Sequence, residues 1–513
     1  MKIMNKVNFK VATLIIATLV WLIAFSYYYS TGNLLAYGDA STHLNISRRV
    51  IDNVSPGLAQ LGGIWLPFLH VLMLPLIGVN FLWKSGLAGS LIGFFAFIFS
   101  IYFLYKTGRE ILPNIHSSGF IASLIYILNP NILYMSTIAM TEVLYIATVT
   151  ASFYFYLRWI KQSKSTDLIA SSFFILLTTL TRYESWFLSL GLAIGVFIIS
   201  LIKSKKINQS EGPFFLFGTV ALLGIAGWLV WNLIIFGDPI YFLHSIYSSK
   251  YQTLAVLTEA DMVSYKNLYM SALTYFWSIY ENAGGSLAFF GIFSIFFLIY
   301  KAIFKRSEIQ KIFLVFALIA SIPCFFLIYA VYSGNAPIHV LQLTDSTFNI
   351  RFGMFMIPSL TFMILFMISM IKRKQEVITL IFVLQLVFFS RTFFHPITLK
   401  AAVAEINSES INLANWIKKN HETGKILVSS AVGNQVIFNS GLNYSNFVTD
   451  GSFDILEATL KEPTNHVKYI ISTKQERDKK RDIVNIEITK NINFLNRYDL
   501  VYENDKYQVY IRQ

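Results

Sequence analysis

The sequence predicts a polytopic α-helical membrane protein with a small C-terminal α/β domain. Two observations support this fold class. Hydrophobic residues make up 55% of the 513 residues and charged residues only 13%, which is about half the charged share of an ordinary soluble domain. Residues 401–513, however, hold 14 basic and 14 acidic side chains, the charge density of a soluble protein. We therefore predict a transmembrane domain over 1–398 and a soluble domain over 399–513.

Eleven apolar segments are candidate spans of a bilayer, which takes roughly 17–25 residues of helix, although the segment 167–181 is short. They are residues 11–30, 81–105, 118–135, 140–158, 167–181, 185–202, 213–236, 285–304, 312–332, 351–371 and 376–394. A shorter apolar run at 64–77 contains two prolines, so we expect a re-entrant or interfacial helix there. The first segment lacks a small-residue cleavage site, and we interpret it as a retained helix rather than a signal peptide.

Basic residues are divided unequally between alternate loops. If the N-terminus is cytoplasmic and successive loops alternate between the two sides of the membrane, 18 basic and five acidic residues lie on the cytoplasmic side, as the positive-inside rule requires. An odd number of spans puts the C-terminal domain outside the plasma membrane. Because basic loops are typical of membrane orientation, the pI near 9.4 does not indicate nucleic acid, which we exclude as a partner.

The C-terminal segment alternates predicted helices and strands, which favours a small α/β domain. We expect helices at 403–420, after Gly433, at 453–460 and at 476–492, strands at 425–430 and 467–473, and a closing strand pair at 497–504 and 507–513. Cys324 is the one cysteine, so neither an intramolecular disulfide nor a cysteine metal site is expected.

The first group of candidate catalytic residues directly follows the first span, in Tyr37-Gly38-Asp39-Ala40-Ser41-Thr42-His43. Asp39 is either the N-cap of the next helix, a common role of aspartate, or a functional carboxylate. His43 lies one helical turn later, so binding of a divalent metal ion by Asp39 and His43 is an open alternative. Two ligands at this spacing are common by chance, and we predict no metal ligands and no certain cofactor.

Four further charged residues lie in apolar sequence on the predicted outer side. Glu142 begins the fourth span, where it either interacts with the helix dipole or is functional, because burying a charge in a membrane is costly. Arg182 and Glu184 either form a structural ion pair or contribute to a site. Arg351 has the planar fork that suits phosphate, although arginine at a membrane surface also contacts lipid headgroups.

Taken together, these motifs resemble the GT-C superfamily of membrane glycosyltransferases, which includes protein O-mannosyltransferases and lipid A aminoarabinose transferases. The resemblance covers roughly residues 1–400 and depends on the order of the motifs. These are Gly38-Asp39, Trp65-Leu66-Pro67, Thr141-Glu142, Thr181-Arg182-Tyr183-Glu184 with Trp186, the segment from Phe236 to Tyr241, and Arg351 with Pro358.

The resemblance implies a role for each matching residue. Asp39 corresponds to the acidic residue that acts as catalytic base or positions the acceptor, and Glu142 to the second acidic position. Arg182 and Arg351 would face the lipid phosphate. The remaining candidates are expected to bind substrate: His43, Trp65, Tyr183 and Glu184.

Two departures from the family pattern prevent transfer of a substrate from either subgroup. The O-mannosyltransferases have adjacent acidic residues where this chain has Asp39-Ala40, and the aminoarabinose transferases have a lysine near a double proline where this chain has Trp65-Leu66-Pro67. The acceptor is therefore left open among protein, lipid and glycan.

The sequence thus predicts an enzyme of the bilayer that transfers a sugar from a polyprenyl-phosphate-linked donor to an acceptor hydroxyl on the outer face. A carboxylate that takes the hydroxyl proton and cations that stabilise the departing phosphate are the groups this reaction needs. Direct displacement inverts the anomeric centre. The alternatives are a transporter, against which we find no matching broken helices, and a non-catalytic scaffold with an outer binding domain.

Overall fold

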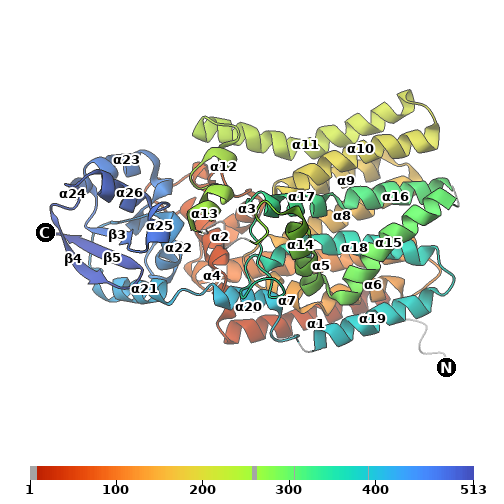
Figure 1. The fold of residues 1–513 in the computed structure, drawn as a ribbon, viewed down its shortest axis with the longest axis horizontal. Coiled ribbons are helices and arrows are strands. Elements are labelled where there is room, and N and C mark those ends of the chain that lie inside the picture. The colour runs from red at the N-terminus through yellow and green to blue at the C-terminus, as the bar shows by residue number, and fades with distance from the viewer. Residues whose placement is uncertain (1–7, 257–262, 305–306, 391) are drawn as a thin grey trace.

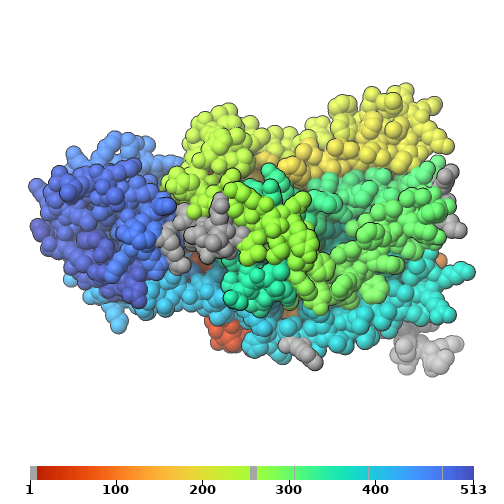
Figure 2. Space-filling view, viewed as in Figure 1, coloured from red at the N-terminus to blue at the C-terminus, as the bar shows by residue number. Residues whose placement is uncertain are grey.

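The computed structural model describes residues 8–256, 263–304, 307–390 and 392–513. It has two parts, a long bundle of helices and a small domain with a β-sheet at one end of the bundle (Figure 1). In the space-filling view the C-terminal domain forms a lobe in contact with the helical part (Figure 2). This arrangement confirms the predicted fold class.

Eight helical segments in the described part of the chain are long and apolar enough to cross a membrane. They are α1 (Phe9–Ser30), α5 (Leu87–Ile111), α8 (Glu142–Gln162), α10 (Glu184–Ser204), α11 (Asn208–Phe236), α15 (Gly285–Phe304), α16 with α17 (Glu308–Ala320 and Ile322–Tyr332), and the 3₁₀-helix η5 with α18 (Ile350–Met356 and Ile357–Ser369). All eight coincide with predicted spans.

The other three predicted spans differ from the expectation, so the count of eleven is not confirmed. The segment 118–135 forms α6 (Ser118–Ile127) and α7 (Pro130–Ser136), which are bent by 69° and count as a ninth span only if taken together. The segments 167–181 and 376–394 form α9 (Ser165–Thr179) and α19 (Lys374–Ser390), of 15 and 17 residues.

The bend between α6 and α7 has a local cause in the sequence. Asn129 caps α7, because its side-chain oxygen accepts hydrogen bonds from the backbone N–H groups of Asn131 and Ile132. Pro130 follows at the first helical position of α7, where the missing backbone N–H costs nothing. Proline cannot continue the hydrogen-bond pattern of the preceding helix α6. An apolar run that appears continuous in the sequence is therefore broken in the structure.

Short helices occupy the region between the bundle and the C-terminal domain (Figure 1). They are α2 (Gly38–Arg49), α3 (Phe68–Ile77), α4 (Asn80–Lys84), α12 (Tyr241–His244), α13 (Ser249–Val256) and α20 (Ile397–Ala404), with α14 (Leu268–Ala283) packed beside η5. The α3 helix has ten residues with Pro75 inside it, too short to span a bilayer, as expected for 64–77.

The C-terminal domain contains a five-stranded sheet in the order β2-β1-β3-β5-β4. Its strands are β1 (Ile426–Val428), β2 (Phe447–Val448), β3 (Tyr469–Thr473), β4 (Tyr498–Glu503) and β5 (Tyr507–Arg512). Strand β1 pairs in parallel with β2 and β3, whereas β5 pairs antiparallel with β3 and β4. The predicted strands are present, and β2 is an addition too short to show a pattern in the sequence.

Helices α21 to α26 complete this domain. Their bounds are α21 (Ser408–Asn420), α22 (Ser430–Asn439), α23 (Phe453–Lys461), α24 (Pro463–His466), α25 (Glu476–Lys479) and α26 (Ile483–Lys490). Two predicted helices are split, at 403–420 because Asn407 caps a new helix and at 476–492 because Asp482 does. Gly433, expected before a helix, lies inside α22.

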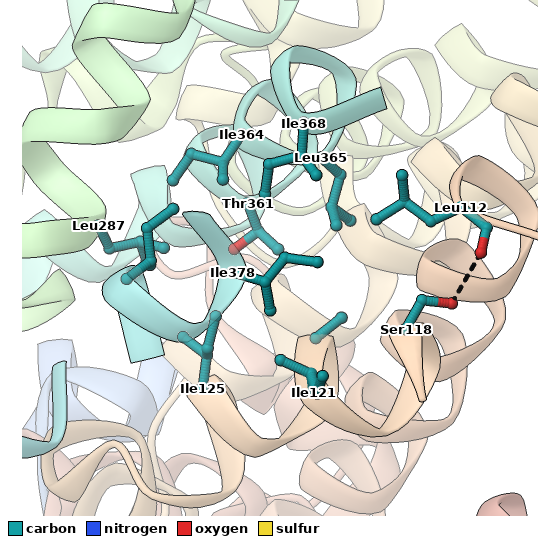
Figure 3. Close-up of a pocket in the computed structure, with 12 residues that line it drawn as sticks. Leu112, Ser118, Ile121, Ile125, Leu287, Thr361, Ile364, Leu365, Ile368 and Ile378 are labelled. Carbon is teal, nitrogen blue, oxygen red and sulfur yellow. Dashed lines mark hydrogen bonds between the residues drawn. The ribbon is translucent and has the colours of Figure 1, made fainter. Parts of the chain in front are cut away.

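An apolar cavity of about 30 Å³ lies between α6, α15, α18 and α19 (Figure 3). The two hydroxyl groups in its lining belong to Ser118 and Thr361, and each donates a hydrogen bond to a backbone carbonyl. Thr361 is ten residues along the chain from Arg351, which is about 15 Å of helix. This cavity is therefore separate from the charged residues predicted to form the site.

Hydrogen bonds join the C-terminal domain to the short helices. The carboxylate of Asp52, in the turn that follows α2, accepts from the backbone N–H groups of Tyr444 (3.1 Å) and Ser445 (3.2 Å) and pairs with Arg48 at 2.9 Å. Burial alone would raise the pKa of Asp52, but the bonds from Ser445 and Arg48 hold it below its ordinary value. The ionised form of Asp52 therefore stabilises the contact.

We expect Asp52→Asn to loosen this contact. A hydrogen bond to a charged group contributes about 1.5–3 kcal/mol, so amide hydrogen exchange at Tyr444 and Ser445 should accelerate and the melting temperature should fall. Because the pKa of Asp52 is lowered in the folded protein, its contribution is present above the ordinary aspartate pKa and is lost as the pH falls through the lowered value. The exposed Asp454 gives the control Asp454→Asn, and equal exchange in both variants would contradict the assignment.

Candidate active site

Arg351 brings together the two carboxylates that the sequence marked as catalytic. Its Nη2 lies 2.5 Å from Oδ2 of Asp39, and its Nε donates to Oε1 of Glu142 at 3.0 Å. Asp39 is in the first turn of α2, Glu142 is the first residue of α8, and Arg351 is in η5. The positions are 312 and 209 residues apart from Arg351 in the chain, so the fold assembles the cluster.

Exposure differs sharply within this cluster. The side chain of Arg351 is 4% exposed and that of Glu142 is fully buried, whereas that of Asp39 is 39% exposed. A buried charge is tolerated only when it is paired, and Arg351 and Glu142 form such a pair. Of the two carboxylates, Asp39 is the one that a substrate hydroxyl can reach.

The alternative prediction, that Asp39 is the N-cap of the helix after the first span, is wrong. The N-cap of α2 is Tyr37, whose side chain makes no capping hydrogen bond, and Asp39 lies inside the helix. Its carboxylate is directed to Arg351 instead, and the ring of Tyr37 lies under the same guanidinium, with its centroid 4.8 Å from Cζ.

Close backbone packing holds η5 in place. The hydroxyl of Ser278 and the side-chain amide of Asn282, both on α14, donate to the backbone carbonyl of Ile350 at 2.7 Å. Gly353 lies so near this helix that an added Cβ would be 2.1 Å from the carbonyl oxygen of Ser278. Glycine is therefore required two residues after Arg351 for η5 to approach α14.

Arg182 and Glu184 form a bidentate ion pair beside the first cluster. The two nitrogen–oxygen distances are 2.8 and 3.2 Å, and Nη1 of Arg182 also donates to the hydroxyl of Thr141 at 3.4 Å. The guanidinium lies over the rings of Phe352 and Phe355, with distances of 4.8 and 4.6 Å to the ring centroids. The pairing expected as the structural alternative is present, and the side chain of Arg182 remains 20% exposed.

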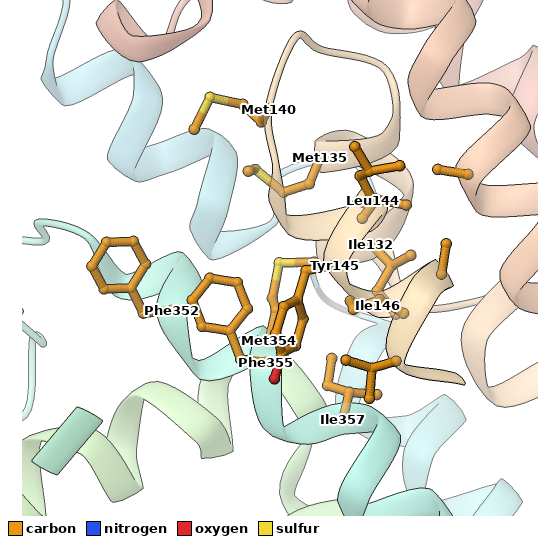
Figure 4. Packing of buried hydrophobic residues seen from close by; sticks show 14 of the residues in the cluster. Ile132, Met135, Met140, Leu144, Tyr145, Ile146, Phe352, Met354, Phe355 and Ile357 are labelled. Carbon is orange, nitrogen blue, oxygen red and sulfur yellow. The ribbon is translucent and has the colours of Figure 1, made fainter. Parts of the chain in front are cut away.

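Apolar packing fixes the floor beneath these charges. Phe352 and Phe355 of η5 lie next to each other, and Phe355 contacts Tyr145 of α8 with ring centroids 4.9 Å apart (Figure 4). The surrounding buried side chains come from α7, α8 and α18, including Ile132 and Ile357 (Figure 4). The guanidinium groups thus lie on a rigid, water-poor surface.

His43 and Trp65 belong to a neighbouring cluster, in which His43 is buried and Trp65 is partly exposed. His43 Nδ1 lies 2.8 Å from Nε2 of His70, and the rings of His43 and Trp65 are 4.3 Å apart. Burial lowers the pKa of His43 well below its ordinary value, with further lowering by His70 and then by the charges of Arg182 and Arg351. Burial lowers the pKa of His70 to about 3, so both imidazoles are neutral near pH 7.

Tyr183 connects the same region to α11. Its hydroxyl donates to the backbone carbonyl of Ile64 at 2.7 Å and accepts from the indole N–H of Trp228 at 3.1 Å. His70 and Trp228 escaped the sequence analysis, because a single histidine or tryptophan in an apolar run has no distinguishing pattern. Tyr37 was within the quoted motif, but nothing in the sequence indicated its stacking on Arg351.

No group of three or more His, Cys, Asp or Glu side chains that could hold a metal ion occurs in the residues that the structure describes. The pair considered for a metal, Asp39 and His43, is directed to different partners, Arg351 and His70.

Comparison with known proteins finds one matching family model and solved structures of similar fold. Residues 67–231 match the family model described as dolichyl-phosphate-mannose-protein mannosyltransferase, a region that contains Glu142 and the Arg182–Glu184 pair. The structure of ArnT from Cupriavidus metallidurans bound to undecaprenyl phosphate superposes on 98% of this chain and 97% of its own, at 10% identity and a TM-score of 0.57. The chain has the GT-C fold.

A second GT-C protein supports the same assignment. The oligosaccharyltransferase of Archaeoglobus fulgidus in its apo form matches 92% of this chain and 70% of its own length, at 12% identity and a TM-score of 0.50. Comparison with curated protein sequences gave no match. The mannosyltransferase model supports a glycosyltransferase-type function, and the long apolar helices make the chain an integral membrane protein.

The close approach of η5 to α14 gives a test of how the site is held. In Gly353→Ala the new methyl group meets backbone atoms of Ser278, so η5 must shift, and overpacking of this kind costs about 1–3 kcal/mol. We expect a lower melting temperature in detergent and reduced activity. Gly227→Ala on α11 is the control, because its Cβ would meet nothing within 4 Å; equal stability of the two variants would show that the approach is not tight.

Proposed function

We propose that the protein transfers a sugar from a polyprenyl-phosphate-linked donor to an acceptor hydroxyl on the outer face of the plasma membrane, with inversion of the anomeric centre. The observation that carries this proposal is the arrangement at Arg351, which holds a buried Glu142 and a partly exposed Asp39 together. The fold adds support, because a structure similar to this chain binds undecaprenyl phosphate.

In the proposed reaction Asp39 is the general base. Its carboxylate takes the proton of the acceptor hydroxyl while the hydroxyl oxygen forms a bond to the anomeric carbon of the donor. The bond from that carbon to the phosphate oxygen breaks, and the electron pair leaves with the phosphate. Because attack and departure occur on opposite faces of the sugar, one displacement inverts the anomeric centre.

The two arginines have different access to the departing phosphate. Arg182 is 20% exposed and rests on two aromatic rings, so we assign it the direct phosphate contact beside Glu184. Arg351 is already bound by two carboxylates and contributes its positive charge to the same region. Buried donors and charges stabilise developing anions strongly, because little water competes with them.

The aromatic side chains next to the site suit a sugar ring. Trp65 and Tyr183 are partly exposed, and we propose that they contact substrate while His43 and Glu184 orient them and Arg182. The acceptor class is left among protein, lipid and glycan. A peptide is favoured by one comparison, because the Archaeoglobus fulgidus oligosaccharyltransferase, with a TM-score of 0.50, has been solved with a tethered acceptor peptide.

Replacing Asp39 by asparagine tests the base directly. Asparagine keeps the size of the side chain but cannot accept the proton, so we expect turnover to fall by roughly 10²–10⁴ with an unchanged melting temperature. The assay is mass spectrometry of products from a panel of undecaprenyl-phosphate sugars with peptide, lipid and glycan acceptors. Asp499→Asn, an exposed position on β4, is the control.

Two outcomes of this assay would oppose the proposal. Wild-type turnover in Asp39→Asn would show that Asp39 is not the general base. The absence of any product from the wild-type protein across the panel would favour a scaffold or a transporter.

The proposed orientation can be checked by cysteine labelling of intact cells. Starting from Cys324→Ala, cysteines at the exposed positions Ser249 and Ser408 should react with an impermeant thiol reagent added outside. A cysteine at Ser204, the last residue of α10, should react only after the membrane is permeabilised. Labelling of Ser204→Cys in intact cells would reverse the orientation.

A further inference from the structure

A third carboxylate faces Arg351 from the connection to the C-terminal domain. Glu405 directly follows α20, and its Oε1 lies 4.0 Å from Nη1 of Arg351. Neither of these two atoms has a hydrogen-bond partner among the residues that the structure describes. The carboxylate of Glu405 also interacts with the backbone N–H of Gly38, in the first turn of the helix that carries Asp39.

The backbone before Glu405 is anchored to the bundle. The backbone N–H and the hydroxyl of Thr398, in α20, donate to the side-chain oxygen of Asn131 at 3.2 and 3.0 Å. The side-chain amide of Asn131 in turn donates to the backbone carbonyl of Glu281 at 3.0 Å. Because α20 is held to α7 and α14 in this way, Glu405 is presented to Arg351 from a fixed support.

The first turn of α2 lacks a side-chain cap of its own, and its free N–H groups attract a negative charge. Glu405 supplies that charge from a segment more than 360 residues away in the sequence. The same charge attracts the Nη1 edge of Arg351, while Asp39 holds the Nη2 edge.

We propose that Glu405 is a positioning residue, which fixes Asp39 through the first turn of α2 and through Arg351. This inference builds on the function proposed above. With Glu405 ionised, Arg351 is shared among three carboxylates, so Asp39 is bound less strongly and remains a competent base. Without the charge of Glu405, Arg351 pairs more fully with Asp39, so the Asp39 carboxylate is less available to the acceptor hydroxyl.

The surroundings of Glu405 make this effect depend on pH. Burial raises the pKa of Glu405 to about 7, against the lowering by Arg351 and with a further rise from Asp39. The charged and titratable groups that face it are Arg351 on η5, Asp39 and Tyr37 on and before α2, and Tyr134 on α7. Glu405 is therefore ionised above about pH 7, and positioning is lost as the pH falls below that value.

The test compares Glu405→Gln with wild type in two measurements. Hydrogen exchange of residues 37–41, corrected for the intrinsic rate at each pH, should be about tenfold faster in Glu405→Gln at pH 8 and should no longer change between pH 6 and 8. In the product assay described for Asp39, kcat should fall about tenfold with KM within twofold, and the activity step near pH 7 should disappear. The control is Glu422→Gln, whose side chain is 84% exposed.

Unchanged exchange at residues 37–41 together with a retained pH step in Glu405→Gln would overturn the proposal. If Glu405→Gln does not fold, Glu405→Asp replaces it, because a shorter carboxylate should keep a pH step while lowering kcat. Wild-type kcat without a pH step in Glu405→Asp would equally overturn it. Failure of the proposed function appears separately, as full activity in Asp39→Asn, since hydrogen exchange does not require turnover.

Discussion

The structure depends on the burial of one guanidinium group. The charge of Arg351 is almost completely removed from solvent, and an unpaired charge in such a place is strongly destabilising, by about 3–5 kcal/mol when one partner of a buried pair is removed. Glu142 and Asp39 must therefore come to it from two other helices. This requirement sets the relative positions of α2, α8 and η5, which together form the proposed site.

The C-terminal domain constrains one of these helices, α2, from the opposite side. Asn45 of α2 donates to the backbone carbonyl of Asn434 at 3.1 Å, and Asp52 binds two backbone N–H groups of the domain. The α2 helix is thus held between the bundle and the sheet domain, with Asp39 at the end nearest Arg351. A domain that resembles an appendage in the sequence is in contact with the helix that carries the proposed base.

The individual charges of the site could be predicted from the sequence, but their contacts could not. Glu142 and Arg351 stand in long apolar runs, where a charge is costly and therefore conspicuous. The contact of Arg351 with Asp39 depends on packing across 312 residues, which has no local pattern. Glu405 escaped prediction for the opposite reason, since it lies in a polar segment where a carboxylate is ordinary. The bend within 118–135 was not predicted, because a hydropathy pattern does not register the cap and the proline that break the helix.

The presence of an arginine beside the proposed general base needs a physical explanation, because the guanidinium already binds the carboxylate that would accept the proton. The additional carboxylates supply it: with Glu142 and Glu405 near the same guanidinium, only part of its charge acts on Asp39. In the proposed reaction the proton that reaches Asp39 neutralises one partner of Arg351 while negative charge accumulates on the departing phosphate. The positive charge of Arg351 that Asp39 no longer balances then stabilises the departing phosphate. Proton transfer and leaving-group stabilisation therefore reinforce each other without movement of a buried side chain.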